Sequence, residues 1–218
     1  MTELKTIVEL YNDDNRRPEV MERAGEILKK GGLVAFPTET VYGLGGDALN
    51  PEASARIYAA KGRPSDNPLI VHIADMEALK VLASEVPEKA RLLADRFWPG
   101  PLTMIMPKSD AVPYTTTGGL DTVAIRMPSH PTAYELIRSS GVYIAAPSAN
   151  TSGRPSPTTA QHVYEDLNGR IDMIIDSGKV DIGLESTIVD LTGEIPTILR
   201  PGYITKEMLE EAVGPVTI

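Results

Sequence analysis

The chain has 218 residues, of which 42% are hydrophobic and 23% charged, and it carries a formal net charge of −9 at pH 7. This length and apolar content suffice for one hydrophobic core, and the acidic balance argues against a general nucleic-acid-binding surface. Because cysteine is absent and the three histidines (His72, His130 and His162) show no ligand spacing, we expect neither disulfides nor a protein-ligated transition metal.

The first 18 residues are polar, and we expect them to form a flexible or short helical extension to a single domain at 19–218. Beyond them the hydrophobic pattern predicts helices over 19–30, 51–60, 87–97, 131–140, 158–167 and 206–212, and strands over 33–36, 69–73, 102–106, 122–127, 142–146, 173–175, 187–190 and 197–199. From Pro37 to the helix cap at Asn50 we expect a loop. Strands occur in adjacent pairs as well as between helices, so the fold class is α/β, a single domain with a twisted mixed β-sheet flanked by helices.

No run of about 18 apolar residues predicts a membrane span. The opening Met-Thr-Glu-Leu-Lys also lacks the basic and then apolar order of a signal peptide. We therefore expect a cytoplasmic protein with no membrane partner.

Two cations lie on a polar segment, Lys61-Gly62-Arg63-Pro64-Ser65-Asp66-Asn67-Pro68, which leads into the apolar strand predicted at 69–73. Its two prolines fix φ and keep their neighbours extended, so the backbone would hold Lys61 and Arg63 in place. An arginine binds phosphate or carboxylate through two parallel hydrogen bonds, whereas a lysine acts as a point charge. The segment predicts a site for a small anion, although a basic loop taken alone is more typical of a solvated turn.

The sequence contains one partial match to a nucleotide-binding motif. Gly43-Leu44-Gly45-Gly46-Asp47-Ala48 fits the dinucleotide pattern G-x-G-x-x-A, but six residues separate its first glycine from the predicted strand. In the dinucleotide fold that glycine follows the strand almost at once, so the match is a coincidence. No G-x-x-x-x-G-K-[ST] loop occurs. Any ATP site would therefore use scattered cations, hydroxyls and backbone amides.

Three motifs occur together in order: Pro37-Thr38-Glu39-Thr40-Val41-Tyr42-Gly43-Leu44, Lys61-x-Arg63 with Pro68-Leu69, and Ser148-Ala149-Asn150. With them the chain resembles the YrdC-like family of threonylcarbamoyl-AMP synthases. The resemblance runs from about Gly31 to Gly202 and includes Arg126-Met127-Pro128, Glu185-Ser186-Thr187-Ile188 and Leu199-Arg200-Pro201-Gly202. Longer members of that family carry a second domain, and the end of this chain at Ile218 suggests the single-domain form.

The resemblance implies an L-threonylcarbamoyladenylate synthase, a nucleotidyltransferase that joins L-threonine, bicarbonate or CO2 and ATP with release of pyrophosphate. Magnesium would enter with ATP as substrate. The product would feed threonylcarbamoyladenosine modification of tRNA, so tRNA and the complex that transfers the threonylcarbamoyl group are implied partners. Because the carbamate of threonine decomposes readily in water, catalysis would depend on burying and positioning it beside the α-phosphate.

The resemblance also implies a concave cationic groove and assigns residues to it. Threonine recognition would fall to Thr40, His72, Arg126 and Ser186. Nucleotide binding would fall to Lys61, Arg63, Asn67, Thr122, Ser148, Asn150, Ser156 and Arg200, with Lys61 and Arg63 as the catalytic cations.

Several of these residues also have an ordinary structural interpretation. Thr40 could satisfy a turn, Thr122 is unremarkable on a strand, and His72 between two apolar residues is typical of a satisfied interior histidine. An arginine at position 126 within a strand needs a partner anion, which a threonine carboxylate or a protein glutamate would supply. Ser148 and Asn150 could cap a local loop.

Two other functions fit parts of the pattern. A tRNA-binding or double-stranded-RNA-binding module without catalysis would use the cationic groove, but the net charge of −9 and the 5% aromatic content argue against it. A carbamoyl-transfer domain of the kind that matures hydrogenase belongs to a much larger enzyme with cysteine-rich zinc modules, which this chain lacks.

Overall fold

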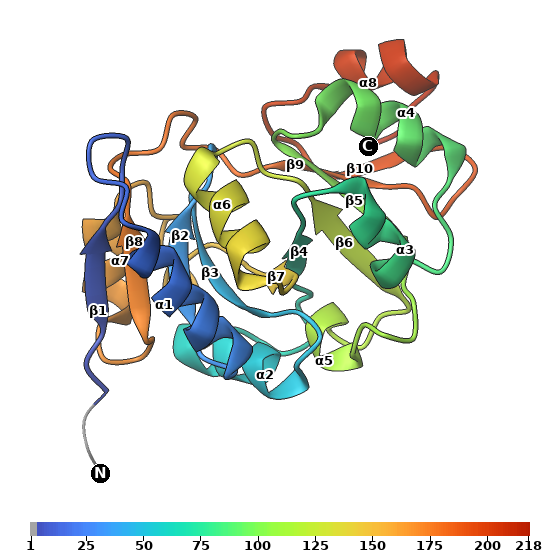
Figure 1. Cartoon of the computed structure of the whole chain (residues 1–218). Helices are drawn as coiled ribbons and strands as arrows, with labels where there is room; N and C mark the ends of the chain where they lie inside the picture. The colour runs from blue at the N-terminus through green and yellow to red at the C-terminus, as the bar shows by residue number, and fades with distance from the viewer. Residues whose placement is uncertain (1–3) are drawn as a thin grey trace.

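The computed structural model describes residues 4–218, and the strands in this part of the chain form one 10-stranded sheet in the order β1-β8-β2-β3-β7-β4-β6-β5-β9-β10 (Figure 1). The strands are β1 (Ile7–Leu10), β2 (Val34–Pro37), β3 (Tyr42–Asp47), β4 (Ile70–His72), β5 (Leu102–Pro107), β6 (Thr122–Arg126), β7 (Ile144–Ala145), β8 (Met173–Asp176), β9 (Thr187–Asp190) and β10 (Thr197–Arg200). Four of the described strand pairs are parallel and five antiparallel, which confirms the mixed α/β sheet.

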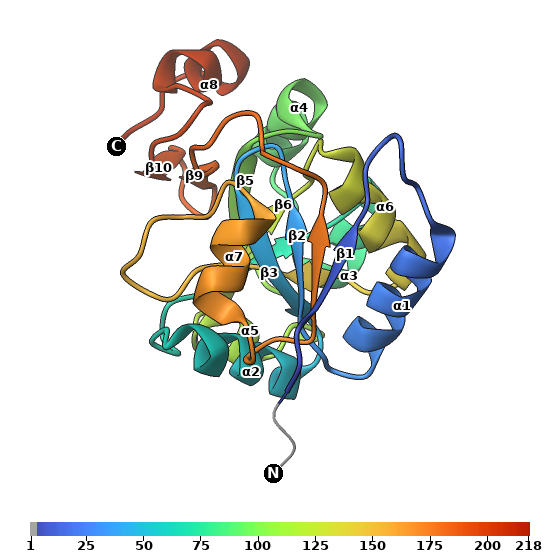
Figure 2. The same ribbon diagram turned by 90° about the vertical axis from the view of Figure 1, so that its left-hand side faces the viewer.

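Helices cover both faces of this sheet. They are α1 (Pro18–Lys29), α2 (Pro51–Lys61), α3 (Leu79–Leu82), α4 (Glu88–Phe97), α5 (Tyr114–Thr117), α6 (Pro131–Ser140), α7 (Ala160–Leu167) and α8 (Lys206–Val213), with a 3₁₀ turn at Met76–Ala78. Figure 2 shows α1 and α6 on one side of the strands and α7 on the other.

Alternate residues of β2 divide between two hydrophobic cores, because successive side chains of a strand point to opposite faces. Val34 and Phe36 pack in the core that contains buried residues of α1 and α6, whereas Ala35 belongs to the core that contains those of α2 and α7. Strand β2 is therefore buried on both faces, as its continuous apolar run predicts.

The described part of the N-terminal segment, residues 4–18, contains a strand where its composition led us to expect a flexible or short helical extension, and residues 1–3 lie outside the described range. Ile7–Leu10 pairs in parallel with β8 at the edge of the sheet, and the Thr6 Oγ1 donates to Ile171 O over 2.7 Å. Because the side chains of β1 remain largely exposed, its sequence lacks the alternation that marks a half-buried strand. The division of the chain at residue 18 stays a prediction.

The segment after β2 also differs from expectation, since much of the predicted loop is strand β3. Tyr42–Asp47 runs antiparallel to β2 across a turn in which Thr38 Oγ1 donates to Val41 O over 2.7 Å. The glycine-rich motif therefore lies largely within a sheet and does not lead from a strand into a phosphate-binding helix. This confirms that the match to the dinucleotide pattern is a coincidence.

Candidate active site

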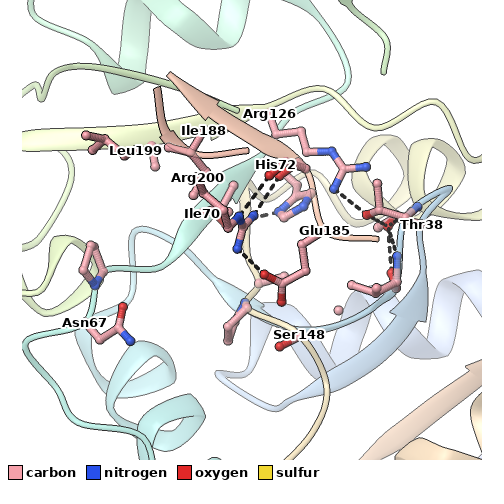
Figure 3. Close-up of a pocket in the computed structure, with 18 of the residues that line it drawn as sticks. Thr38, Asn67, Ile70, His72, Arg126, Ser148, Glu185, Ile188, Leu199 and Arg200 are labelled. Carbon is pink, nitrogen blue, oxygen red and sulfur yellow. Dashed lines mark hydrogen bonds and ion pairs between the residues drawn. The ribbon is translucent and has the colours of Figure 1, made fainter. Parts of the chain in front are cut away.

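A cavity of about 410 Å³ lies among the turn after β2, the loop after α2, the segment that leads into β9 and the last residues of β10 (Figure 3). Strands β4, β5 and β6 contribute part of its wall. The lining side chains are Thr38, Thr40, Val41, Gly43, Arg63, Asn67, Pro68, Ile70, His72, Ile105, Ala124, Arg126, Ala146, Pro147, Ser148, Glu185, Ser186, Ile188, Leu199 and Arg200.

The structure brings most of the residues proposed from the sequence to this cavity. Those that line it are Thr40, Arg63, Asn67, His72, Arg126, Ser148, Ser186 and Arg200. Those that do not are Lys61, Thr122, Asn150 and Ser156. The residues of the first group come from six separate segments of the chain, so only the folded sheet places them together.

Arg63 is held by its own loop. Its Nε donates to Asn67 O over 3.2 Å, and one terminal nitrogen donates to Asn67 Oδ1 over 2.7 Å and to Pro68 O over 3.1 Å. The left-handed conformation of Gly62, with φ of 62°, ends α2 and starts this loop. The guanidinium is therefore oriented before any ligand arrives.

Lys61 occupies a different place from the one expected, because it belongs to α2 and is only 1% exposed. Its Nζ donates to Ser148 O, to Asn150 O over 2.6 Å and to Asn150 Oδ1 over 3.4 Å. Burial, with a smaller effect of the Arg63 charge, lowers the pKa of Lys61 to about 8. Lys61 thus fixes the loop that presents Ser148 and has no surface on the cavity itself.

Arg126 is buried, with 4% exposure, and its guanidinium is shared among protein oxygens. It forms an ion pair with Glu39, donates to Thr40 Oγ1 over 2.9 Å and donates to Gly100 O over 3.3 Å. The second oxygen of Glu39 accepts from Ser129 N over 3.0 Å. A protein glutamate therefore supplies the counter-charge that the sequence required for this arginine, and the remaining guanidinium hydrogens are available to the cavity.

Arg200 lies at the end of β10 and is paired with Glu185, an acidic residue that lines the cavity. Its Nε donates to Ser186 O over 3.0 Å, and a terminal nitrogen donates to Ser186 Oγ over 3.1 Å. Ser156 does not reach the cavity, because its Oγ donates to Glu185 Oε1 over 2.8 Å. Figure 3 shows Arg200 and Glu185 in direct contact, between Asn67 on one side and Arg126 and Thr38 on the other.

The three arginines that line the cavity differ in whether a carboxylate neutralises their charge. Arg126 and Arg200 each have a carboxylate partner, whereas within residues 4–218 Arg63 hydrogen-bonds only to neutral oxygens. Burial lowers the pKa of Arg63 from its ordinary value, which indicates a cation with incomplete hydration. An anion in the cavity would therefore gain most beside Arg63.

His72 is buried beside Phe36, with ring centroids 6.0 Å apart, and its Nδ1 lies 3.1 Å from Ile70 O. Burial, and secondarily the charge of Arg126, lowers the pKa of His72 to about 3. The imidazole is therefore neutral near pH 7 and offers the cavity a polar group without charge.

This shift makes the stability of the domain depend on pH. Below pH 6.5, the ordinary pKa of histidine, His72 is protonated in the unfolded chain but stays neutral in the folded protein. The free energy of unfolding therefore decreases as pH falls from 6.5 toward 3. From about pH 7 to about pH 5 the loss due to this residue should be about 2 kcal/mol. Urea unfolding of the wild type and of His72→Asn at both pH values should show that the variant lacks this loss. The exposed His162, changed to Asn, is the control. If the free energy of unfolding changed equally with pH in all three proteins, the assignment to His72 would be contradicted.

Two other residues assigned to the nucleotide lie just outside the cavity. Thr122 shares a face of β6 with Ala124 and Arg126, since alternate residues of a strand point the same way, and it continues the wall by one position. The amide of Asn150 donates to Thr151 O over 3.0 Å and to Arg154 O over 2.8 Å. Asn150 thus caps its own loop, as its ordinary structural interpretation proposes.

Sequence reasoning did not single out Glu39 and Glu185 as site residues. Each acidic residue stands within a motif that was recognised, but its arginine partner is 87 and 15 positions away respectively. An arginine that enters a buried strand is the signal that could have prompted a search for a partner carboxylate.

Within residues 4–218 no group of three or more His, Asp or Glu side chains is arranged to hold a metal ion. The helices in the same range include none with the length and apolar character needed to cross a bilayer.

Comparisons with known proteins agree with this architecture. A family model for the Sua5, YciO and YrdC proteins, described as telomere recombination, matches residues 26–202. The chain belongs to the Sua5/YciO/YrdC family. The expected YrdC-like membership is therefore confirmed.

Relatives within the family are close in sequence and in structure. The chain is 58% identical over 195 residues to the threonylcarbamoyl-AMP synthase of Pyrococcus abyssi, covering 89% of this chain and 57% of that protein. It is 57% identical over 202 residues to the corresponding protein of Bacillus subtilis, covering 92% and 58%. The crystal structure of P. abyssi Sua5 complexed with L-threonine matches with a TM-score of 0.94 and 54% identity, covering 97% of this chain and 62% of that one. The chain thus spans less than two thirds of these relatives.

Proposed function

We propose that this member of the Sua5/YciO/YrdC family is an L-threonylcarbamoyladenylate synthase. It would join L-threonine, bicarbonate or CO2 and ATP, the last with magnesium, and release pyrophosphate. The observation that carries the proposal is the cavity lined by Arg63, Arg126 and Arg200, for which residues 4–218 provide two carboxylate partners, Glu39 and Glu185. Support also comes from the relatives called threonylcarbamoyl-AMP synthase.

The cavity has two chemically different ends. Around Thr40, His72, Arg126 and Ser186 it offers hydroxyls, a neutral imidazole and a paired guanidinium, which suit a small amino acid with a carboxylate and a hydroxyl. The structure of P. abyssi Sua5 is complexed with L-threonine, which favours the same amino acid here.

The second end suits a polyphosphate. Arg63, Asn67 and Ser148 lie on loops, and Arg200 lies at the end of a strand, so their polar atoms converge on the cavity from different segments. Guanidinium groups bind phosphate oxygens through parallel hydrogen bonds and stabilise the charge that develops during transfer. We assign ATP to this end, with Thr122 at its outer limit.

The chemistry requires positioning more than a covalent nucleophile. The threonine amine adds to CO2 with loss of a proton and forms a carbamate, whose oxygen attacks the α-phosphorus of ATP while the bond to pyrophosphate breaks. Holding the carbamate against the phosphate supplies roughly 7 to 11 kcal/mol of the barrier reduction. The arginines would stabilise the transition-state charge, and the enclosed site would protect the carbamate from water.

The product would serve a tRNA-modifying reaction. A mixed anhydride of a carbamate and AMP is an activated acyl group, so a transferase that carries it to an amine of tRNA must follow. We therefore propose tRNA and a threonylcarbamoyl-transfer complex as downstream partners in the cytoplasm. The alternative of an RNA-binding module without catalysis is not favoured, because the carboxylates of Glu39 and Glu185 neutralise two of the three cations that line the site.

The proposal is tested by incubating the protein with ATP, magnesium, bicarbonate and one amino acid at a time. Threonine with bicarbonate should give pyrophosphate and an acylated AMP of the expected mass. Serine should react more slowly, because loss of one methyl contact costs about 1 to 3 kcal/mol. Equal rates with threonine, serine and alanine, or product without bicarbonate, would overturn the proposal.

A further inference from the structure

Two side chains assigned to the nucleotide are bonded to the same acidic residue. The Oε1 of Glu185 accepts from Ser156 Oγ over 2.8 Å, and Oε2 is ion-paired with Arg200. Glu185 itself lines the cavity (Figure 3). None of the roles assigned so far explains a carboxylate at this position.

A carboxylate on this wall opposes the binding of a triphosphate, because like charges repel across the cavity. The Glu185 side chain is 32% exposed, so solvent screens this repulsion only in part. Glu185 must therefore favour the reaction through the geometry of the site, since it does not strengthen the binding of ATP.

The pair with Arg200 connects the two ends of the cavity. Arg200 also donates twice to Ser186, on the threonine side, and Ser186 Oγ lies 2.8 Å from the buried Thr103 Oγ1. Because Glu185 and Ser186 are consecutive, one short piece of backbone fixes all three nitrogens of the guanidinium. The orientation of Arg200 is thus set by the protein before a ligand enters.

A close approach of backbone holds that piece in place. A Cβ built on Gly202 would lie 2.6 Å from Glu185 O and 2.6 Å from Thr187 N, so only glycine fits there. Gly202 follows Arg200 by two residues. The same turn therefore fixes both partners of the ion pair relative to each other.

We propose that Glu185 is a positioning residue for adenylate formation, which holds Arg200 on the nucleotide side of the cavity at a fixed place relative to Ser186, while Ser156, outside the cavity lining, donates to the carboxylate and fixes it. This inference rests on the proposed function. The carboxylate aims the guanidinium at the transferring phosphate, so it favours turnover while it opposes ATP binding.

The test is Glu185→Gln, which keeps the shape of the side chain and removes its charge. Pyrophosphate release should fall about tenfold or more in kcat, because Arg200 is no longer held in place. The Kd for magnesium ATP, measured by calorimetry without threonine, should stay within about threefold or become tighter. Glu194→Gln is the control, since Glu194 is exposed in the connection between β9 and β10, and it should change neither quantity.

A double-mutant cycle separates positioning from general scaffolding. Once Arg200→Ala is present, Glu185→Gln should cause little further loss of kcat, because its partner is already gone. Additive losses, an unchanged kcat in Glu185→Gln, or parallel losses of ATP binding, threonine binding and melting temperature would overturn the inference. A wild type that makes no pyrophosphate would overturn the proposed function and this inference with it, whereas an active wild type confines failure to Glu185.

Discussion

Arg63→Ala should reduce pyrophosphate release roughly 10²- to 10³-fold, the usual cost of losing one preorganised charge stabiliser. Arg63 is the lining arginine for which no carboxylate partner is found in residues 4–218, so its charge is the one least neutralised by the protein. Its hydrogen bonds go to its own loop, and their loss should leave the sheet intact. Steady-state kinetics with threonine, bicarbonate and ATP, together with thermal melting, measure both effects.

The matched control for this variant is Arg91→Ala. Arg91 is exposed on α4, away from the cavity lining, and its replacement removes the same charge from the whole protein. It should keep the kinetics of the wild type. If Arg63→Ala melted far below the wild type while its folded fraction kept full activity, the loop would be structural and the assignment wrong.

Arg126→Lys should raise the threonine KM about 10- to 100-fold, as expected when charge-assisted hydrogen bonds worth about 1.5 to 3 kcal/mol are lost. A lysine keeps the charge but cannot span Glu39, Thr40 and Gly100 together, which the guanidinium does. The Kd for ATP measured without threonine should change little, because the nucleotide is assigned to the other end of the cavity.

This variant also strains a buried ion pair, so stability must be followed in parallel. Breaking such a pair by removal of one partner costs about 3 to 5 kcal/mol, and a lysine that retains the charge should lose less. Arg23→Lys alters a surface pair with Glu9 by the same substitution and should affect neither ligand. Equal weakening of threonine and ATP in Arg126→Lys would show that the two ends of the cavity are not separate subsites.

The sequence predicted the alternation of strands and helices and most residues of the cavity, because motifs and hydrophobic periods are local properties. It did not predict β3, whose glycines have low strand propensity and are held by pairing with β2 and β7. Strand β1 was missed for a similar reason, since its partner β8 lies more than 160 positions away. Tertiary pairing overrode local preference in both segments.

It was harder to predict what each residue does in the site than to predict which residues lie near it. Lys61 follows the pattern of an anion-binding cation, yet the loop at Ser148 to Asn150 folds back onto it and takes up its hydrogen bonds. Glu39 and Glu185 carry no mark in the sequence that pairs them with particular arginines. Contacts between segments that are distant in the chain decide these roles, and only the fold contains them.

The wall of the cavity is assembled from segments between Thr38 and Arg200, which span most of the domain. A partly folded form in which the segment at Thr38 or the segment at Arg200 has left the sheet therefore loses part of this wall. Ligands must therefore bind the native state in strong preference to every open form, and this linkage raises the stability of the whole domain. At a free concentration of about 100 times Kd the gain is about 2.7 kcal/mol, so substrate supply itself would protect the protein from unfolding and proteolysis.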